Sequence, residues 1–169
     1  MRRWDGAMVD AACFEPRHPQ DFVRGLKESH ALPYTRPDVS NELSYSPTWG
    51  LIASLGNGSL EGTYNQITDS NGDSVITVIV RATIGSTTTF NAGNWTISVP
   101  VACGGVAATG HAEAATYGVT TFGTVSLAAS ATTASVKSND NNRTWSDTVP
   151  KTWATGNTLY LTISYGTKV

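Results

Sequence analysis

The sequence predicts an all-β protein: an antiparallel β-sandwich of jelly-roll or similar topology, preceded by an extended, Pro-rich N-terminal arm with at most one short helix. Apolar and polar residues alternate with period two from Tyr45 onward, and clusters of turn-forming residues separate the alternating stretches. No segment has a sustained 3.6-residue pattern. About seven short strands with this spacing are typical of an antiparallel sandwich.

Residues 1–44 differ in composition from residues 45–169, and we divide the chain there into an anchoring arm and a β domain. The arm holds thirteen of the twenty-four Lys, Arg, Asp and Glu residues and four of the seven prolines. Because proline fixes its backbone and lacks a donor, we expect no sheet in the arm. One short helix can begin at Pro19, with Phe22 and Leu26 on one face. With too few apolar groups for its own core, the arm should become ordered only against another surface.

The β domain contains three strong and three weaker strand candidates. The strong ones are SVITVIVRATI (74–84), NWTISVPV (94–101) and TLYLTISY (158–165). The weaker ones are LEGTYNQI (60–67), TGHAEAA (109–115) and FGTVSLAA (122–129). Turn signals lie at residues 55–59, 70–73, 93–95 and 139–142.

Composition and charge exclude several classes of function. Only 14% of the residues are charged and the net charge is -2, so the basic surface that binds nucleic acid is missing. No apolar run is long enough for a signal peptide or for membrane insertion, and we expect folding in a cytoplasm. Cys13 and Cys103 are expected to be reduced thiols. A surface rich in Ser and Thr but poor in charge favours contact with further copies, so we expect an oligomer.

The stretch CFEPRHPQDFVRG (13–25) contains a thiol, a histidine, two carboxylates and two arginines. A catalytic nucleophile needs a base held rigidly beside it, and a flexible segment bounded by prolines provides no such support. We therefore interpret the segment as a docking site on a partner protein. The predicted partner-anchoring residues are Phe14, Glu15, Arg17, His18, Asp21, Phe22, Arg24 and Leu26.

Two motifs in the β domain suggest metal sites, and both have simpler interpretations. His111-Ala-Glu113 lacks the downstream Cys-x-x-Cys of zinc deaminases, so a solvent-facing or partner-facing strand is favoured. Residues 69–73, DSNGD, lack the glutamate that a calcium loop requires at its twelfth position, which is Val80. This stretch instead predicts an Asn-Gly hairpin turn. The sequence predicts no catalytic residue, no metal site and no cofactor.

Four tryptophans fall in the β domain: Trp49, Trp95, Trp145 and Trp153. Indole rings serve as core anchors and also as platforms for sugar rings. Trp95 has the phase of a core residue in its strand. Trp145 lies in the polar stretch NDNNRTWSD and is predicted to be the most exposed, which makes it the candidate ligand-binding residue.

Four separated motifs in the β domain resemble a β domain found at the C-terminal end of tail and fibre proteins in phages of actinobacteria. They are YSPTW (45–49), LGNGSLEGTYNQI (55–67), IGSTTTFNAGNWTISVP (84–100) and PKTWATGNTLYLTISY (150–165). The chain departs from that pattern at Asn157, where Asp is more usual. The N-terminal FEPRHPQDFVRG and PYTRP also resemble segments of small phage proteins encoded with head-completion and tail genes.

This resemblance implies a virion structural protein, assembled in the host cytoplasm, with a fibre, collar or decoration role. Its arm would bind connector or tail subunits at the head-tail connector or tail, and its β domain would be displayed outward as a homotrimer. Two alternatives remain open. One is a receptor-binding module that recognises host-surface glycans, and the other is a small glycan hydrolase. The hydrolase has only Glu61, Glu113, Asp140 and Asp147 as plausible carboxylates, so we expect the protein not to be an enzyme.

Overall fold

The structure is a computed structural model that describes residues 38–39, 42–116 and 118–168. The chain divides between Arg36 and Pro37, and every described residue belongs to the second unit, Pro37–Val169. The short helix expected at Pro19 lies outside the described residues. The described part of the chain is thus the β domain together with the strands that lead into it.

The described residues form twelve strands and no helix, which confirms the predicted all-β class. The strands are β1 (Asp38–Val39), β2 (Leu43–Tyr45), β3 (Trp49–Gly50), β4 (Ile52–Ser54), β5 (Ser59–Thr68), β6 (Ser74–Thr83), β7 (Thr89–Phe90), β8 (Thr96–Ser98), β9 (Ala108–Thr116), β10 (Val119–Leu127), β11 (Thr133–Ser138) and β12 (Thr158–Gly166).

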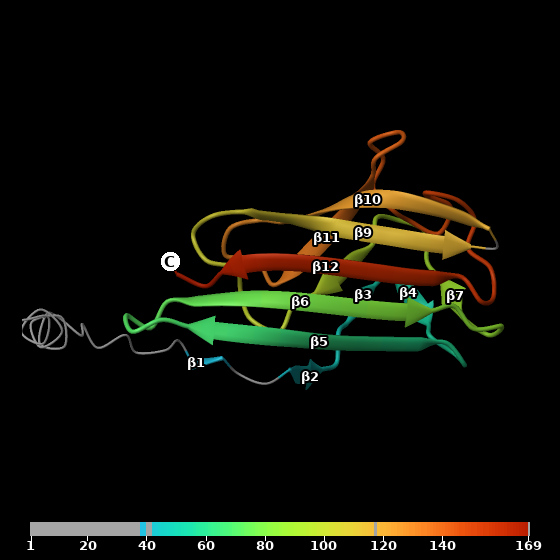
Figure 1. The fold of residues 1–169 in the computed structure, drawn as a ribbon. Helices are drawn as coiled ribbons and strands as arrows, with labels where there is room; N and C mark the ends of the chain where they lie inside the picture. The colour runs from blue at the N-terminus through green and yellow to red at the C-terminus, as the bar shows by residue number, and fades with distance from the viewer. Residues whose placement is uncertain (1–37, 40–41, 117, 169) are drawn as a thin grey trace, which may run out of the picture. The chain divides into compact units, whose positions relative to one another are not determined.

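Ten of these strands form one antiparallel sheet, and β4 and β7 form a second, two-stranded sheet. The order in the large sheet is β1-β5-β6-β12-β9-β10-β11-β8-β3, and β2 also pairs with β5. This sheet is strongly curled. Figure 1 shows β5, β6, β12 and β9 side by side in one layer, with β3 and β4 behind them. The apolar faces of the curled sheet are therefore turned toward a common core, as in a sandwich.

The hairpin between β5 and β6 follows directly from its turn residues. Gly72 has a φ of +85°, a backbone conformation that glycine adopts without strain. One carboxylate oxygen of Asp69 accepts hydrogen bonds from the backbone N–H groups of Asn71 and Asp73, both at 2.9 Å. The predicted hairpin turn at residues 69–73 is confirmed, and it leads into ten cross-strand pairs between β5 and β6.

In the central strands, the residues buried in the core are the ones that the period-two alternation of the sequence predicts. The two central strands β6 and β12 bury every second residue and expose or half-bury the others. The weaker candidates at 60–67, 109–115 and 122–129 are also strands, as β5, β9 and β10. The buried core residues of β6 and β12 are Ile76, Val78, Val80, Ala82, Leu159, Leu161, Ile163 and Tyr165.

Three details of the fold differ from the sequence prediction. The candidate at 94–101 forms only the three-residue strand β8, and β11 was not predicted because its inward residues are small. The expectation of no sheet before Tyr45 is wrong, since β1 and the first two residues of β2 pair with β5. No proline interrupts residues 38–46, so this stretch keeps the backbone donors that a strand needs.

Four buried tryptophans of the core form a cluster with Phe90, which is partly buried. Trp153 contacts Trp49, Trp95 and Trp145, with ring centroids 6.5, 5.0 and 5.9 Å apart. Trp95 also packs edge-on against Trp49 at 4.6 Å and stacks on Phe90 at 5.0 Å. Aromatic pairs in such geometries contribute about 0.5–1.5 kcal/mol each beyond the burial of their surface. We call these five residues the tryptophan cluster.

Trp145 was predicted to be exposed, and this prediction is wrong: its side chain is only 1% exposed. Its neighbours are polar because they form a turn, and after that turn the chain runs back antiparallel to β11, with Thr144 paired to Lys137. The Trp145 N–H donates to the Val136 carbonyl at 2.8 Å, and the Trp95 N–H donates to the Trp145 carbonyl at 2.8 Å. These backbone bonds aim the indole into the core.

Gly123 of β10 provides the space that the Trp145 indole occupies. A Cβ atom added at Gly123 would lie 2.9 Å from Trp145 Cζ2, 2.8 Å from Val136 Cγ1 and 2.8 Å from the Lys137 carbonyl oxygen. Each distance is shorter than van der Waals contact allows. The burial of Trp145 therefore requires glycine at this position.

We predict that Gly123→Ala lowers the free energy of unfolding by about 1–3 kcal/mol, because the added methyl group overpacks the core beside Trp145. Thermal and urea unfolding measure the change. The matched control is Gly166→Ala on β12, where an added Cβ would lie 3.9 Å from its nearest neighbour, the Ser74 carbonyl oxygen. Equal stability losses in the two variants would contradict the packing described for Trp145.

Candidate functional site

The eight residues predicted to anchor the arm to a partner lie outside the described residues, so their role stays a prediction. They are Phe14, Glu15, Arg17, His18, Asp21, Phe22, Arg24 and Leu26. The structure instead describes how the chain enters the β domain. The strands β1 and β2, which we call the edge strap, run antiparallel along β5.

Tyr45 is the last residue of the edge strap. It links the place where the chain enters the β domain to both layers of the domain. Its ring packs over Gly62 of β5, where an added Cβ would lie 2.4 Å from the ring atom Cε1. Its hydroxyl donates a hydrogen bond to the Ser98 carbonyl of β8 at 3.2 Å. Because β5 and β8 lie near opposite ends of the strand order, this one side chain bridges the curled sheet.

Two further bonds hold the chain just after Tyr45. The Thr48 N–H donates to the Ser98 hydroxyl at 2.7 Å, and the Ser98 N–H donates to the Thr48 carbonyl at 2.9 Å. Tyr45 also packs edge-on against Tyr64 of β5, with ring centroids 6.0 Å apart. Both strands of the edge strap are therefore paired with β5, and its end is fixed to β8.

A second tyrosine, Tyr165 of β12, lies in the same part of the core. Its hydroxyl donates to the Val101 carbonyl at 2.7 Å. Burial raises the pKa of Tyr165 from 10.0 to about 12. Burial also raises the pKa of Tyr45, and the nearby Tyr165 raises it further. Both phenols are held in the neutral form that can donate these hydrogen bonds.

The motif His111-Ala-Glu113 lies on β9 with the predicted orientation. His111 is exposed and Glu113 is half-buried, while Ala112 between them is fully buried. The prediction that these residues lie on an outward strand face is confirmed.

The structure does not bring Glu61 and Glu113 together. Glu61 pairs with Arg81, Arg81 with Tyr160, and Tyr160 with Glu113, so three strand spacings separate the carboxylates. At about 4.8 Å per spacing this is roughly 14 Å. Glycoside hydrolases hold their two carboxyl groups about 5–9.5 Å apart. Asp140 lies in the turn after β11 and is exposed, and Asp147 is half-buried.

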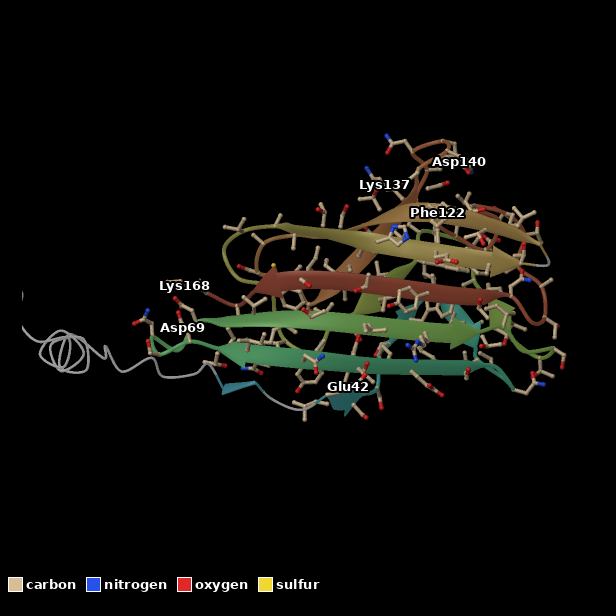
Figure 2. The ribbon with its side chains drawn as sticks, viewed as in Figure 1. Glu42, Asp69, Phe122, Lys137, Asp140 and Lys168 are labelled. Carbon is tan, nitrogen blue, oxygen red and sulfur yellow. The ribbon has the colours of Figure 1, made fainter. Side chains whose placement is uncertain are left out.

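Sequence reasoning missed an open cleft of about 540 Å³ beside β10 and β11. Its lining is polar: Thr124, Ser126, Lys137, Ser138, Asn139 and Asn142. Thr124 lies opposite Lys137 in the strand pairing, and its hydroxyl hydrogen-bonds the Asn139 side-chain oxygen at 2.9 Å. Figure 2 shows Lys137 and Phe122 at the same edge of the domain, with Asp140 in the turn above them. No single sequence motif marks this cleft, because two strands and a turn build it.

The candidate ligand residue Trp145 is part of the tryptophan cluster and has no exposed face to offer a ligand. Asn157, the position that departs from the phage pattern, is also buried, and its side-chain oxygen accepts a hydrogen bond from the Ala154 N–H at 2.8 Å. An amide oxygen fulfils this acceptor role as a carboxylate would.

In the described part of the chain, no three His, Cys, Asp or Glu side chains gather closely enough to hold a metal ion. The same residues include no helix with the length and apolarity needed to cross a membrane.

The fold defines the class of the described unit: an antiparallel all-β domain whose apolar core includes a cluster of four tryptophans. In comparisons with protein-family models, curated proteins and solved structures, nothing matches the chain. The resemblance to phage tail and fibre proteins therefore remains a prediction from the sequence motifs.

We predict a loss of stability at alkaline pH that depends on Tyr165. Its pKa is 10.0 in the unfolded chain and about 12 in the folded chain. The stabilisation that it gives is therefore complete below pH 10 and is lost as the pH rises from about 10 toward 12. Tyr165→Phe should melt lower than the parent at pH 8, because it loses the bond to Val101. The gap between the two melting temperatures should narrow above pH 10, and a constant gap up to pH 11.5 would contradict this account of Tyr165.

Proposed function

We propose that this chain is a non-enzymatic structural protein of a bacteriophage particle, with a fibre, collar or decoration role. Its N-terminal arm, within residues 1–44, binds connector or tail subunits, and its β domain, residues 45–169 together with the edge strap, is displayed on the outside. The four phage-like motifs support this role, and the observation that carries it is the edge strap held by Tyr45.

The edge strap gives the arm a mechanically suitable attachment. Its residue pairs run from Asp38↔Thr68 to Tyr45↔Gly62 along β5. A force on the arm would reach the domain through these pairs, so their backbone hydrogen bonds would bear it before the core does. The strap also covers part of the edge of β5, which would otherwise be a template for unwanted strand pairing. Both properties suit a domain displayed in many copies.

The outer face of the sheet supports contact between copies of the chain. Thr77 of β6 hydrogen-bonds Ser164 of β12 through their hydroxyls at 2.9 Å, and one row of the face carries the charged residues Glu61, Arg81 and Glu113. A face with few charges, and with both signs among them, can pack against another copy of the chain with little charge repulsion. We propose that the displayed β domains associate as homotrimers.

Two truncated chains distinguish the role of the arm in anchoring from the role of the edge strap in folding. A chain lacking residues 1–36 keeps the edge strap, and we predict that it folds and stays soluble but is missing from purified particles. A chain lacking residues 1–44 also loses β1 and most of β2, which uncovers β5, so it should melt at a lower temperature and aggregate more readily. Mass spectrometry of the particles, together with melting curves of both purified chains, measures these effects.

The full-length chain, expressed at the same level in trans, is the control for incorporation. Normal incorporation of the chain lacking residues 1–36 would contradict the anchoring role of the arm. Identical melting curves for the two truncated chains would contradict the structural role of the edge strap.

A further inference from the structure

The cleft beside β10 and β11 presents several polar groups that the protein itself does not use. Within the described residues, the Lys137 ammonium, the Ser126 hydroxyl and the Asn142 side chain have no hydrogen-bond partner. The Asn139 side chain uses its oxygen to bind Thr124, which leaves its two N–H donors available. The volume of about 540 Å³ is typical of small-ligand sites, but the polar and open lining suits a hydrated ligand.

An exposed aromatic surface continues the cleft along β10. Phe122 precedes Thr124 by two residues, so both side chains lie on the same strand face, about 7 Å apart. The Phe122 side chain is 48% exposed, and the His111 ring of β9 lies beside it with centroids 5.5 Å apart and planes 35° apart. We call Phe122 and His111 the aromatic platform. The Asn139 N–H donates to the Phe122 carbonyl at 3.1 Å, which ties the platform to the turn that lines the cleft.

The turn that forms one wall of the cleft is held in place before any ligand binds. The Asn142 N–H donates to the Ser138 carbonyl at 2.9 Å, and the Ser138 N–H donates to the Arg143 carbonyl at 2.8 Å. The Arg143 N–H donates to the Asn141 side-chain oxygen at 3.0 Å. A preformed wall lowers the entropy lost on binding.

Charges of both signs surround the cleft and platform, and among the described residues Lys137 is the only charged one in the lining of the cleft itself. The cation Lys137 lies on β11, and the anion Asp140 and the cation Arg143 lie in and just after the turn that follows this strand. The anion Glu113 lies on β9, directly opposite Phe122. The two acidic side chains oppose the attraction of Lys137 for an anion, which favours a neutral ligand.

These features match the chemistry of a sugar. The C–H face of a pyranose ring is apolar and packs on the face of an aromatic ring, while its hydroxyls require donors and acceptors at its rim. We propose that the cleft and the aromatic platform together bind a neutral oligosaccharide, with one sugar unit over Phe122 and the next among Thr124, Lys137 and Asn139.

The position of this site agrees with a displayed domain but does not depend on the virion role. The edge strap lies against β5, whereas the cleft lies beside β10, and β6, β12 and β9 separate the two. Figure 2 likewise shows Glu42 and Phe122 at opposite edges of the domain. An arm attached at one edge would leave the cleft facing away from the particle.

The test is a titration of the full-length, ¹⁵N-labelled chain, followed by NMR, with short oligosaccharides of hexoses, of N-acetylhexosamines and of hexuronic acids. We expect at least one neutral series to shift amides within residues 122–126 and 137–142. Disaccharides should bind roughly tenfold more tightly than the corresponding monosaccharides, because they contact both the platform and the cleft. Raising the NaCl concentration from about 0.05 to about 0.5 M should change the Kd by less than about twofold.

Phe122→Ala and Asn139→Ala should each weaken binding by roughly tenfold. Both side chains are exposed, so the variants should keep the far-ultraviolet circular dichroism and tryptophan fluorescence of the parent. The matched control is Val75→Ala, which removes a 52% exposed apolar side chain from β6 and should bind like the parent.

Three results would overturn the proposal. The first is no amide shift with any neutral oligosaccharide at about 10 mM, where even weak sugar binding is visible. The second is a set of shifts outside both segments, and the third is binding of hexuronic acid oligosaccharides alone.

Discussion

The packing of Trp153 against three other tryptophans is the interaction on which the rest of the structure depends. Trp49 and Trp95 lie in or next to the short strands β3 and β8, and Trp145 and Trp153 lie in the long connection between β11 and β12. These segments have little regular hydrogen bonding of their own. The tryptophan cluster holds them against the long strands and so closes the curled sheet around one core.

Trp145 connects the tryptophan cluster to the surface of the domain. Its indole occupies the space above Gly123, and its backbone bonds to Val136 and Trp95 fix where the chain emerges from the turn at 139–142. That turn forms a wall of the polar cleft. Tyr45 has the corresponding role at the other edge, where it ties the edge strap to β8. A rigid core thus positions two surfaces, one suited to attachment and one suited to contact with a ligand.

Much of the fold could be predicted from the sequence, because each long strand shows the alternation of apolar and polar residues within its own segment. Alternation identified β6 and β12, and the Asn-Gly pair at 71–72 identified the hairpin between β5 and β6. The site could not be found in the same way. Trp145 was placed on the surface from its polar neighbours, but its burial depends on Gly123, which is distant in sequence. Likewise the cleft joins residues of β10 and β11 whose proximity only the strand pairing reveals.

The most direct test of the proposed structural role is a cryo-electron microscopy reconstruction of intact phage particles produced in cells that express this chain. The account predicts density for the sandwich of residues 37–169 on the outside of the particle, with the edge strap toward it and the cleft beside β10 and β11 facing solvent. Particles that lack this density, or that hold the domain with the strap facing solvent and the cleft against the particle, would contradict it.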